Sequence, residues 1–144
     1  MQKGNIEFTY NPETCIRTAN YSGQIDDEIL LAAFRGLIEA PDFIPIAHDL
    51  SDLRFAEDIG VTVNGLKALG TMMSAPTVGP RPEILPGLAI VTNSVYIFGL
   101  GRMYGMLTDE KLPKITKTFM DMEKAMTWLL SLPTPQKMKG SFND

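Results

Sequence analysis

Apolar and polar residues alternate at the start of the chain. Along residues 5–10, Ile6, Phe8 and Tyr10 fall on one face, and this period of two predicts a strand with one buried face. Residues 14–22 are rich in residue types that favour strands and end at a Ser-Gly pair. We therefore expect the two segments to pair as an antiparallel hairpin.

The pattern changes to a helical period from Asp26 onward. Leu30, Phe34 and Ile38 form one apolar stripe, and the acidic residues at the start favour the positive end of a helix dipole. Because proline cannot continue a helix, this one is predicted to end before Pro41.

Two short apolar runs without helical spacing, 43–49 and 88–92, predict strands buried inside a sheet. The first run is predicted as a strand despite Pro45. Between the two runs, we expect a polar loop over 51–57 and then a helix that begins near Asp58.

The uncharged segment 84–101 is predicted to be the centre of the fold. Its 18 residues reach the lower length limit of a membrane span, but Pro86, Gly87 and the polar triplet 92–94 divide it. We therefore expect no transmembrane segment here. A buried strand followed by an apolar helix from Val95 is predicted instead.

The end of the chain supplies one more strand and helix. Residues 114–120 alternate and carry lysines typical of a sheet edge, while Asp121 is predicted to cap a helix that stops at Pro133. A polar, frayed tail is expected over 134–144. The order β-β-α-β-α-β-α-β-α predicts one α/β domain over 1–133, with a mixed sheet of about five strands and about four helices.

Composition narrows the classes of function. The 144 residues suit a single domain, and the net charge of −4 opposes binding to nucleic acid or to an anionic membrane. Cys15 is the only cysteine, which excludes a disulfide within the chain. Because the first residues contain no apolar signal core, we expect a cytoplasmic protein.

The sequence contains two groups of residues that suggest chemistry. His48, Asp49 and Ser51 look like a catalytic set, but neighbours on a strand point to opposite faces, so we expect no enzyme and no cofactor. An acidic group could attract a cation such as magnesium, although solvation and helix capping explain the same residues without a metal, and none is predicted. This group is Asp49, Asp52, Glu57 and Asp58.

A ligand-binding hypothesis rests on the apolar helix near its only charge. Arg102 and Tyr104 can hold a carboxylate or phosphate group, while methionines surround an apolar tail. The alternative is a solvated arginine beside ordinary core methionines. The candidate ligand-binding residues are Arg102, Tyr104, Met73, Met103 and Met106. Gly101 and Gly105 share a face of this helix and are expected to let a neighbouring backbone approach.

Two phrases of the sequence resemble a known family. GLGRMYGML at 99–107 and FMDMEKAMTWL at 119–129 are similar to the SpoIIAA-like group of STAS domains, which is related to CRAL-TRIO lipid carriers. With the order of elements, the resemblance spans about 4–132. It implies a STAS-like fold but says little about function, since the group is largely uncharacterised.

The resemblance also implies a regulatory position. STAS antagonists carry a phosphorylatable serine at the start of the helix after the third strand, and the matching phrase here offers Asp58 and Ile59, without a hydroxyl. We therefore expect the phosphorylation switch to be absent, with Asp58 as a fixed negative charge at the helix start.

Three functions remain open from the sequence, of which an enzyme is the third, because no pair of nucleophile and base is visible. The first is a non-catalytic regulatory or protein-interaction module, and the alternative is a carrier or sensor of a small amphipathic, lipid-like molecule. In the alternative, the pocket is expected between the helices at 58–74 and 95–107. The methionines and other apolar residues are more than we expect a small domain to bury completely, and they also predict a homodimer.

Overall fold

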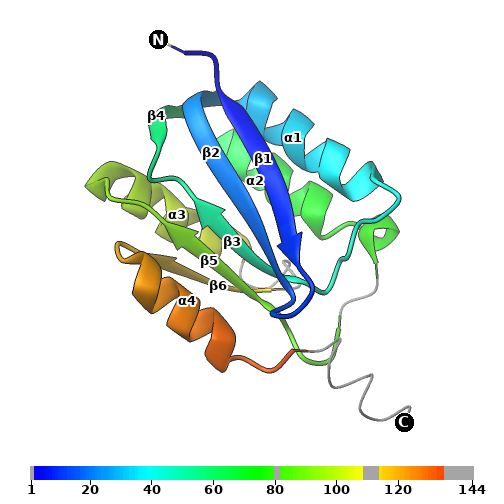
Figure 1. Ribbon diagram of the computed structural model, residues 1–144. Helices are drawn as coiled ribbons and strands as arrows, with labels where there is room; N and C mark the ends of the chain where they lie inside the picture. The colour runs from blue at the N-terminus through cyan, green and yellow to red at the C-terminus, as the bar shows by residue number, and fades with distance from the viewer. Residues whose placement is uncertain (1, 80–81, 109–113, 135–144) are drawn as a thin grey trace, which may run out of the picture.

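A mixed six-stranded sheet with helices on both faces forms the described part of the protein (Figure 1). The computed structural model describes residues 2–79, 82–108 and 114–134. The strands are β1 (Asn5–Asn11), β2 (Ile16–Asp26), β3 (His48–Asp52), β4 (Ala56–Gly60), β5 (Gly87–Val91) and β6 (Ile115–Phe119). The helices are α1 (Asp27–Glu39), α2 (Val63–Met73), α3 (Val95–Thr108) and α4 (Met122–Ser131), with a short 3-10 helix η1 (Pro76–Val78).

The strand order is β1-β2-β3-β5-β6, with β1 antiparallel to β2 and the following pairs parallel. Strand β2 is long enough to pair with β3 along its first half and with β4 along its second half. The register shifts at Gly23, whose φ of +71° suits glycine. A Cβ at Gly23 would lie 2.7 Å from the Lys3 carbonyl oxygen.

Most of the predicted elements are confirmed. The hairpin β1–β2, the helix α1 capped by Asp26, the buried strand β5 followed by α3, and the edge strand β6 followed by α4 all form. The α/β class with a mixed sheet and four helices is therefore confirmed, but the sequence reasoning missed β4. The tail predicted over 134–144 lies, apart from Thr134, outside the described residues.

Three predicted boundaries near the centre of the chain were wrong. The strand expected over 43–49 begins only at His48, and the loop expected over 51–57 contains the end of β3 and the start of β4. The helix expected from Asp58 begins at Val63, because the Thr62 side chain accepts a hydrogen bond from the Gly65 amide and so caps α2.

The two faces of the sheet are covered differently. Helices α1, α2 and α3 cover one face, whereas α4 is the only described helix on the other (Figure 1). The core beneath α4 is made of Ile16, Leu50, Ala89, Val91, Ala125 and Leu129. Alternate residues of the strands point to each face, so that β2 and β5 contribute to both cores. Strand β3 contributes Leu50 to the core beneath α4 and turns Asp49 and Ser51 to the other face.

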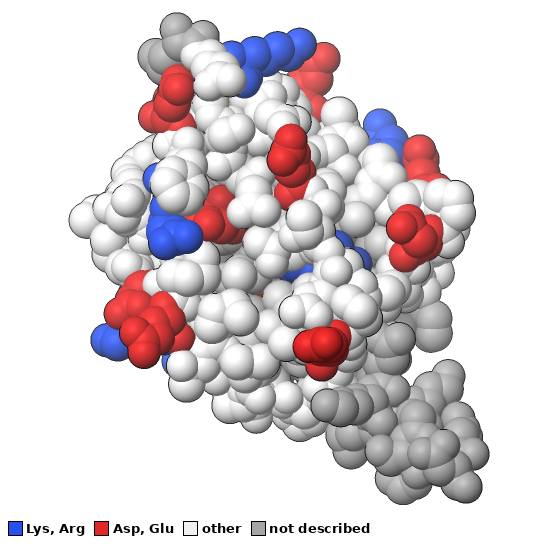
Figure 2. Space-filling view, viewed as in Figure 1, with Lys and Arg blue, Asp and Glu red and all other residues white. Residues whose placement is uncertain are grey.

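The surface carries no continuous charged region on the face seen in Figure 2, where acidic side chains stand at separate places. None of the described helices is long and apolar enough to cross a membrane.

Candidate functional site

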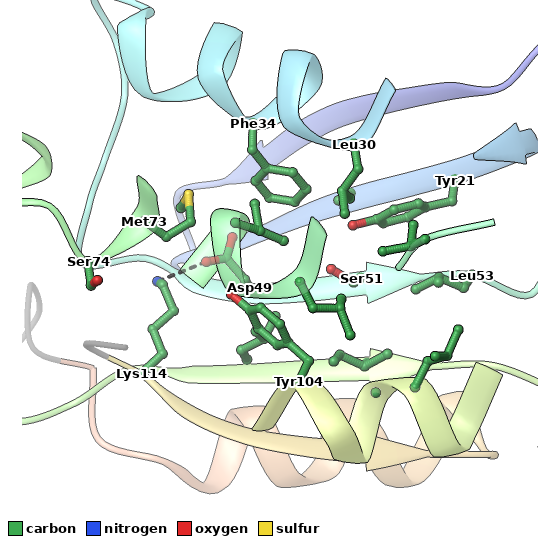
Figure 3. Close-up of a pocket in the computed structure, with 18 of the residues that line it drawn as sticks. Tyr21, Leu30, Phe34, Asp49, Ser51, Leu53, Met73, Ser74, Tyr104 and Lys114 are labelled. Carbon is green, nitrogen blue, oxygen red and sulfur yellow. Dashed lines mark ion pairs between the residues drawn. The ribbon is translucent and has the colours of Figure 1, made fainter. Parts of the chain in front are cut away.

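A cavity of about 150 Å³ lies between the sheet and the helices α1, α2 and α3 (Figure 3). Its wall is mainly apolar because the inward positions of β2 and β5 meet the apolar stripes of the three helices. The apolar lining includes Ala19, Ile25, Leu30, Phe34, Leu66, Leu69, Met73, Leu88, Ile90 and Ile97. The cavity is therefore suited to an apolar group.

Three charged side chains meet at one end of this cavity. Arg17 on β2 lies opposite Asp49 on β3, and its Nε and Nη2 donate to the two carboxylate oxygens at 2.7 and 3.0 Å. Lys114 Nζ approaches Asp49 Oδ2 at 2.8 Å from the residue before β6. The exposed fractions of the three side chains are only 5%, 14% and 5%, for Arg17, Asp49 and Lys114.

Three oxygen atoms surround the amino group of Lys114. Besides Asp49, Nζ donates to the carbonyl oxygen of Ala47 and, at 3.5 Å, to that of Pro45. Burial lowers the pKa of Lys114, the Asp49 carboxylate raises it in part and Arg17 lowers it, so that the pKa lies below its usual value. Because each of the three oxygen acceptors requires an N–H, we take the lysine as protonated.

Asp49 is held in its charged form. Burial raises the pKa of its carboxyl, but Lys114 and Arg17 together outweigh burial and hold the pKa below its usual range. Two cations and one carboxylate leave the cluster with one positive charge in excess.

Hydroxyl groups complete the polar part of the cavity. Tyr21 interacts with Ser51 on β3, and burial raises the pKa of both Tyr21 and Tyr104, so that both remain neutral phenols. Tyr104 is only 6% exposed, and its hydroxyl makes no hydrogen bond with any residue that the structure describes. In Figure 3 this hydroxyl points toward Asp49 from α3.

The cavity has two chemically different ends. Ser74 lies at the same end of the cavity as the ion pair between Lys114 and Asp49, whereas Leu53 lies at the opposite end (Figure 3). This polarity suits a molecule with one polar group and an apolar body.

The residues predicted for ligand binding are not brought together as a set. Tyr104 and Met73 line the cavity, as the ligand hypothesis requires. Met103 is partly buried against the core but does not belong to the lining. Arg102 and Met106 are exposed on the outer side of α3, away from the cavity. Arg102 therefore does not line the cavity, whose described charged lining residues are Asp49 and Lys114.

Sequence reasoning did not identify Arg17 or Lys114 as site residues, and it considered Asp49 only in a catalytic set and an acidic group. Lys114 was assigned to a sheet edge, where lysines are common. A signal existed for Arg17, because a charged residue in phase with the inward-facing Ala19 and Tyr21 requires a buried partner.

His48 lies on the other face of the sheet from Asp49 and Ser51. Its Nδ1 accepts a hydrogen bond from the Gly87 amide at 2.9 Å, while its Nε2 has no partner among the described residues. Adjacent His48 and Asp49 therefore point to opposite faces of the sheet, as expected for neighbours on a strand.

The acidic group does not converge on one point. Asp49 binds Arg17 and Lys114, and Asp52 pairs with Arg54 at 2.9 Å. Glu57 and Asp58 are exposed on β4. Within residues 2–79, 82–108 and 114–134, no three histidine, cysteine or acidic side chains are grouped so as to hold a metal ion.

The predicted regulatory position is not at a helix start. Asp58 is exposed and Ile59 is buried, and both belong to β4. The negative charge at the start of α2 comes instead from Asp27, which accepts from the Thr62 amide at 2.9 Å and from its hydroxyl at 2.6 Å. Thr62 therefore supplies a hydroxyl at the helix start, but a phosphate there would be repelled by Asp27.

Comparison with known proteins identifies the fold. No family model matches the sequence, and no curated protein matches it. The structure matches the crystal structure of an uncharacterised protein of the DUF3478 family with a SpoIIAA-like fold, from Shewanella loihica PV-4. The TM-score is 0.51 at 16% identity, over 88% of this chain and 93% of the other. The chain therefore has the SpoIIAA-like fold, as its element order and the two sequence phrases predicted.

Proposed function

We propose that the protein is a non-catalytic binder, acting as a carrier or sensor, of a small molecule with an apolar body and one polar group. The observation that carries this proposal is the interior cavity, which is apolar along most of its wall and charged at one end. A ligand pocket is typically of this kind, with few polar groups that fix the orientation of the ligand.

The volume limits the size of the ligand. The cavity of about 150 Å³ is comparable in volume to an engineered cavity that binds benzene. Pockets for drug-sized ligands are larger, roughly 300–1,000 Å³. The proposal is therefore a molecule of about ten non-hydrogen atoms or fewer, rather than a full-length lipid.

The polar groups support binding rather than catalysis. Ser51 and Tyr104 offer hydroxyls to the cavity, but the imidazole of His48 faces the opposite side of the sheet. Asp49 is engaged by two cations, which makes it a poor base. A protein-interaction role stays a prediction and concerns the outer surface rather than the cavity.

The experiment is to reduce the cavity and measure the binding of an apolar probe. Ala19 lines the cavity and is 5% exposed, so Ala19→Leu adds three carbon atoms to the space that the ligand needs. Titration with toluene, followed by the NMR signals of the Ile, Leu and Met methyl groups, is expected to show saturable binding to the wild type. The variant is expected to bind at least tenfold more weakly.

Ala68→Leu is the matched control, because Ala68 is exposed on α2 and the same change there leaves the cavity intact. Native mass spectrometry of freshly purified protein then shows whether a molecule is retained from the cell. If toluene produces no saturable shifts, or affects Ala19→Leu and the wild type equally, the proposed cavity function is wrong.

A further inference from the structure

We infer that the ligand of the cavity is a small carboxylic acid, bound as its carboxylate by Lys114 and Tyr104. This inference rests on the proposed function and adds the chemical class of the ligand. It follows from the charges at the polar end and from the hydrogen-bond donors that remain available there.

Charge balance is the first argument. Arg17, Asp49 and Lys114 form an alternating line of positive, negative and positive groups, with Lys114 lining the cavity. An excess charge that is buried without a counter-ion is costly, and a ligand anion beside Lys114 supplies that counter-ion. A neutral ligand leaves the excess uncompensated.

Asp49 repels a ligand carboxylate only weakly, because both of its oxygens already accept hydrogen bonds from cationic side chains. Arg17 donates to both of them, and Lys114 pairs with Oδ2. The charge of this carboxylate is therefore largely compensated within the protein, and the net field toward the cavity is positive.

The available donors are the second argument. The Lys114 bond to the Pro45 carbonyl is 3.5 Å long, so a closer and charged acceptor would replace it at little cost. Tyr104 supplies a second donor, since its buried hydroxyl is a neutral phenol with no partner in the described part of the chain. Two donors match the two oxygens of a carboxylate.

A phosphate group fits this end of the cavity less well. It brings three acceptor oxygens and up to two negative charges, whereas Lys114 and Tyr104 are two donors. The nearby hydroxyls of Ser74 and Ser51 are already engaged by the Gly70 carbonyl and by Tyr21. The second charge would also lie close to Asp49 without compensation. The geometry thus favours an aromatic or short-chain carboxylate whose apolar part extends toward Leu53.

The test compares ligands of one shape and different charge. Benzoate, benzamide, phenyl phosphate and toluene are titrated into the full-length protein, with the methyl NMR signals as the readout. Benzoate is expected to bind at least tenfold more tightly than benzamide. In Lys114→Met this preference is expected to disappear, whereas toluene still binds.

Tyr104→Phe removes only the hydroxyl and serves as a second variant if Lys114→Met does not fold. It is expected to weaken benzoate several-fold and to leave toluene unchanged. Arg102→Met, which removes an exposed cation of α3, is the control and should retain the preference for benzoate.

The two proposals fail in different ways. If toluene binds but benzamide or phenyl phosphate binds as tightly as benzoate, the carboxylate assignment is wrong and the cavity function stands. A preference for benzoate that survives in both Lys114→Met and Tyr104→Phe also overturns the assignment. If neither toluene nor benzoate binds, both proposals are overturned.

Discussion

The buried His48 is expected to make the stability of the protein depend on pH. It is 1% exposed, and its pKa is lowered by burial and by the charge of Lys114, while Asp49 opposes the shift. In the unfolded chain a histidine takes up a proton near its ordinary pKa of 6.5, but the folded protein resists this uptake. The contribution of the neutral His48 to the free energy of unfolding is therefore fully present above pH 6.5. It is lost as the pH falls from there through the lowered pKa.

We expect the free energy of unfolding to fall between pH 7.5 and 5.5, by at most about 1.4 kcal/mol per pH unit below the ordinary pKa. In His48→Gln, which keeps an acceptor for the Gly87 amide, the decrease should be smaller. Urea denaturation of both proteins at the two pH values measures this. Equal slopes for the two proteins would assign the pH dependence to other groups.

At the scale of one element, α3 shows that glycines on the same helix have different roles. A Cβ at Gly101 would lie 2.9 Å from Thr118 Oγ1 and 3.3 Å from Ile90 Cγ2. Gly101→Ala is therefore expected to destabilise the protein by about 1–3 kcal/mol through overpacking. At Gly99 a Cβ would meet nothing within 4 Å, so Gly99→Ala should stabilise by about 0.5–1 kcal/mol.

Gly105 departs from the sequence-based expectation. A Cβ there would lie 3.5 Å from Thr116, an ordinary contact, so the close packing expected at both Gly101 and Gly105 applies only to Gly101. Chemical denaturation of the three alanine variants measures the difference. A destabilised Gly99→Ala or a stabilised Gly101→Ala would show that the helix packs differently.

The elements predicted correctly are those whose pattern of apolar residues arises only from packing within the sheet or against it. The alternation in β1 and the apolar run of β5 both reflect packing within the sheet. Residues 43–47 misled the prediction because Phe43, Pro45 and Ile46 are apolar for another reason, namely that they line the cavity from a loop. Strand β4 was missed because it is short and mostly exposed, with only Ile59 buried.

At the scale of the whole molecule, the polar end of the cavity depends on strand register. Arg17 and Asp49 are 32 residues apart and face each other only because β2 and β3 run parallel in this register. Local periodicity carries no information on such pairing, so Lys114 appeared to be an edge residue. Tyr104 and Met73 were named for their residue types, a polar-tipped aromatic near Arg102 and one of the surrounding methionines, and both line the cavity.

The outer face of α3 bears on assembly. Val95, Tyr96 and Met106 are 80%, 64% and 77% exposed. Apolar residues that remain exposed on one helix face are typical of an interface, so the homodimer stays our prediction, with this face as its centre. A protein partner of the kind predicted from the sequence would compete for the same surface.

Light scattering should then give a mass of about twice the 15.9 kDa of the chain. Tyr96→Glu places a charge within the proposed contact and is expected to shift the protein to the monomer. Phe55→Glu is the matched control, because Phe55 is 69% exposed between β3 and β4 and is expected to leave the dimer intact. A wild-type monomer at high concentration would rule out the homodimer, and dissociation by Phe55→Glu but not by Tyr96→Glu would place the interface elsewhere.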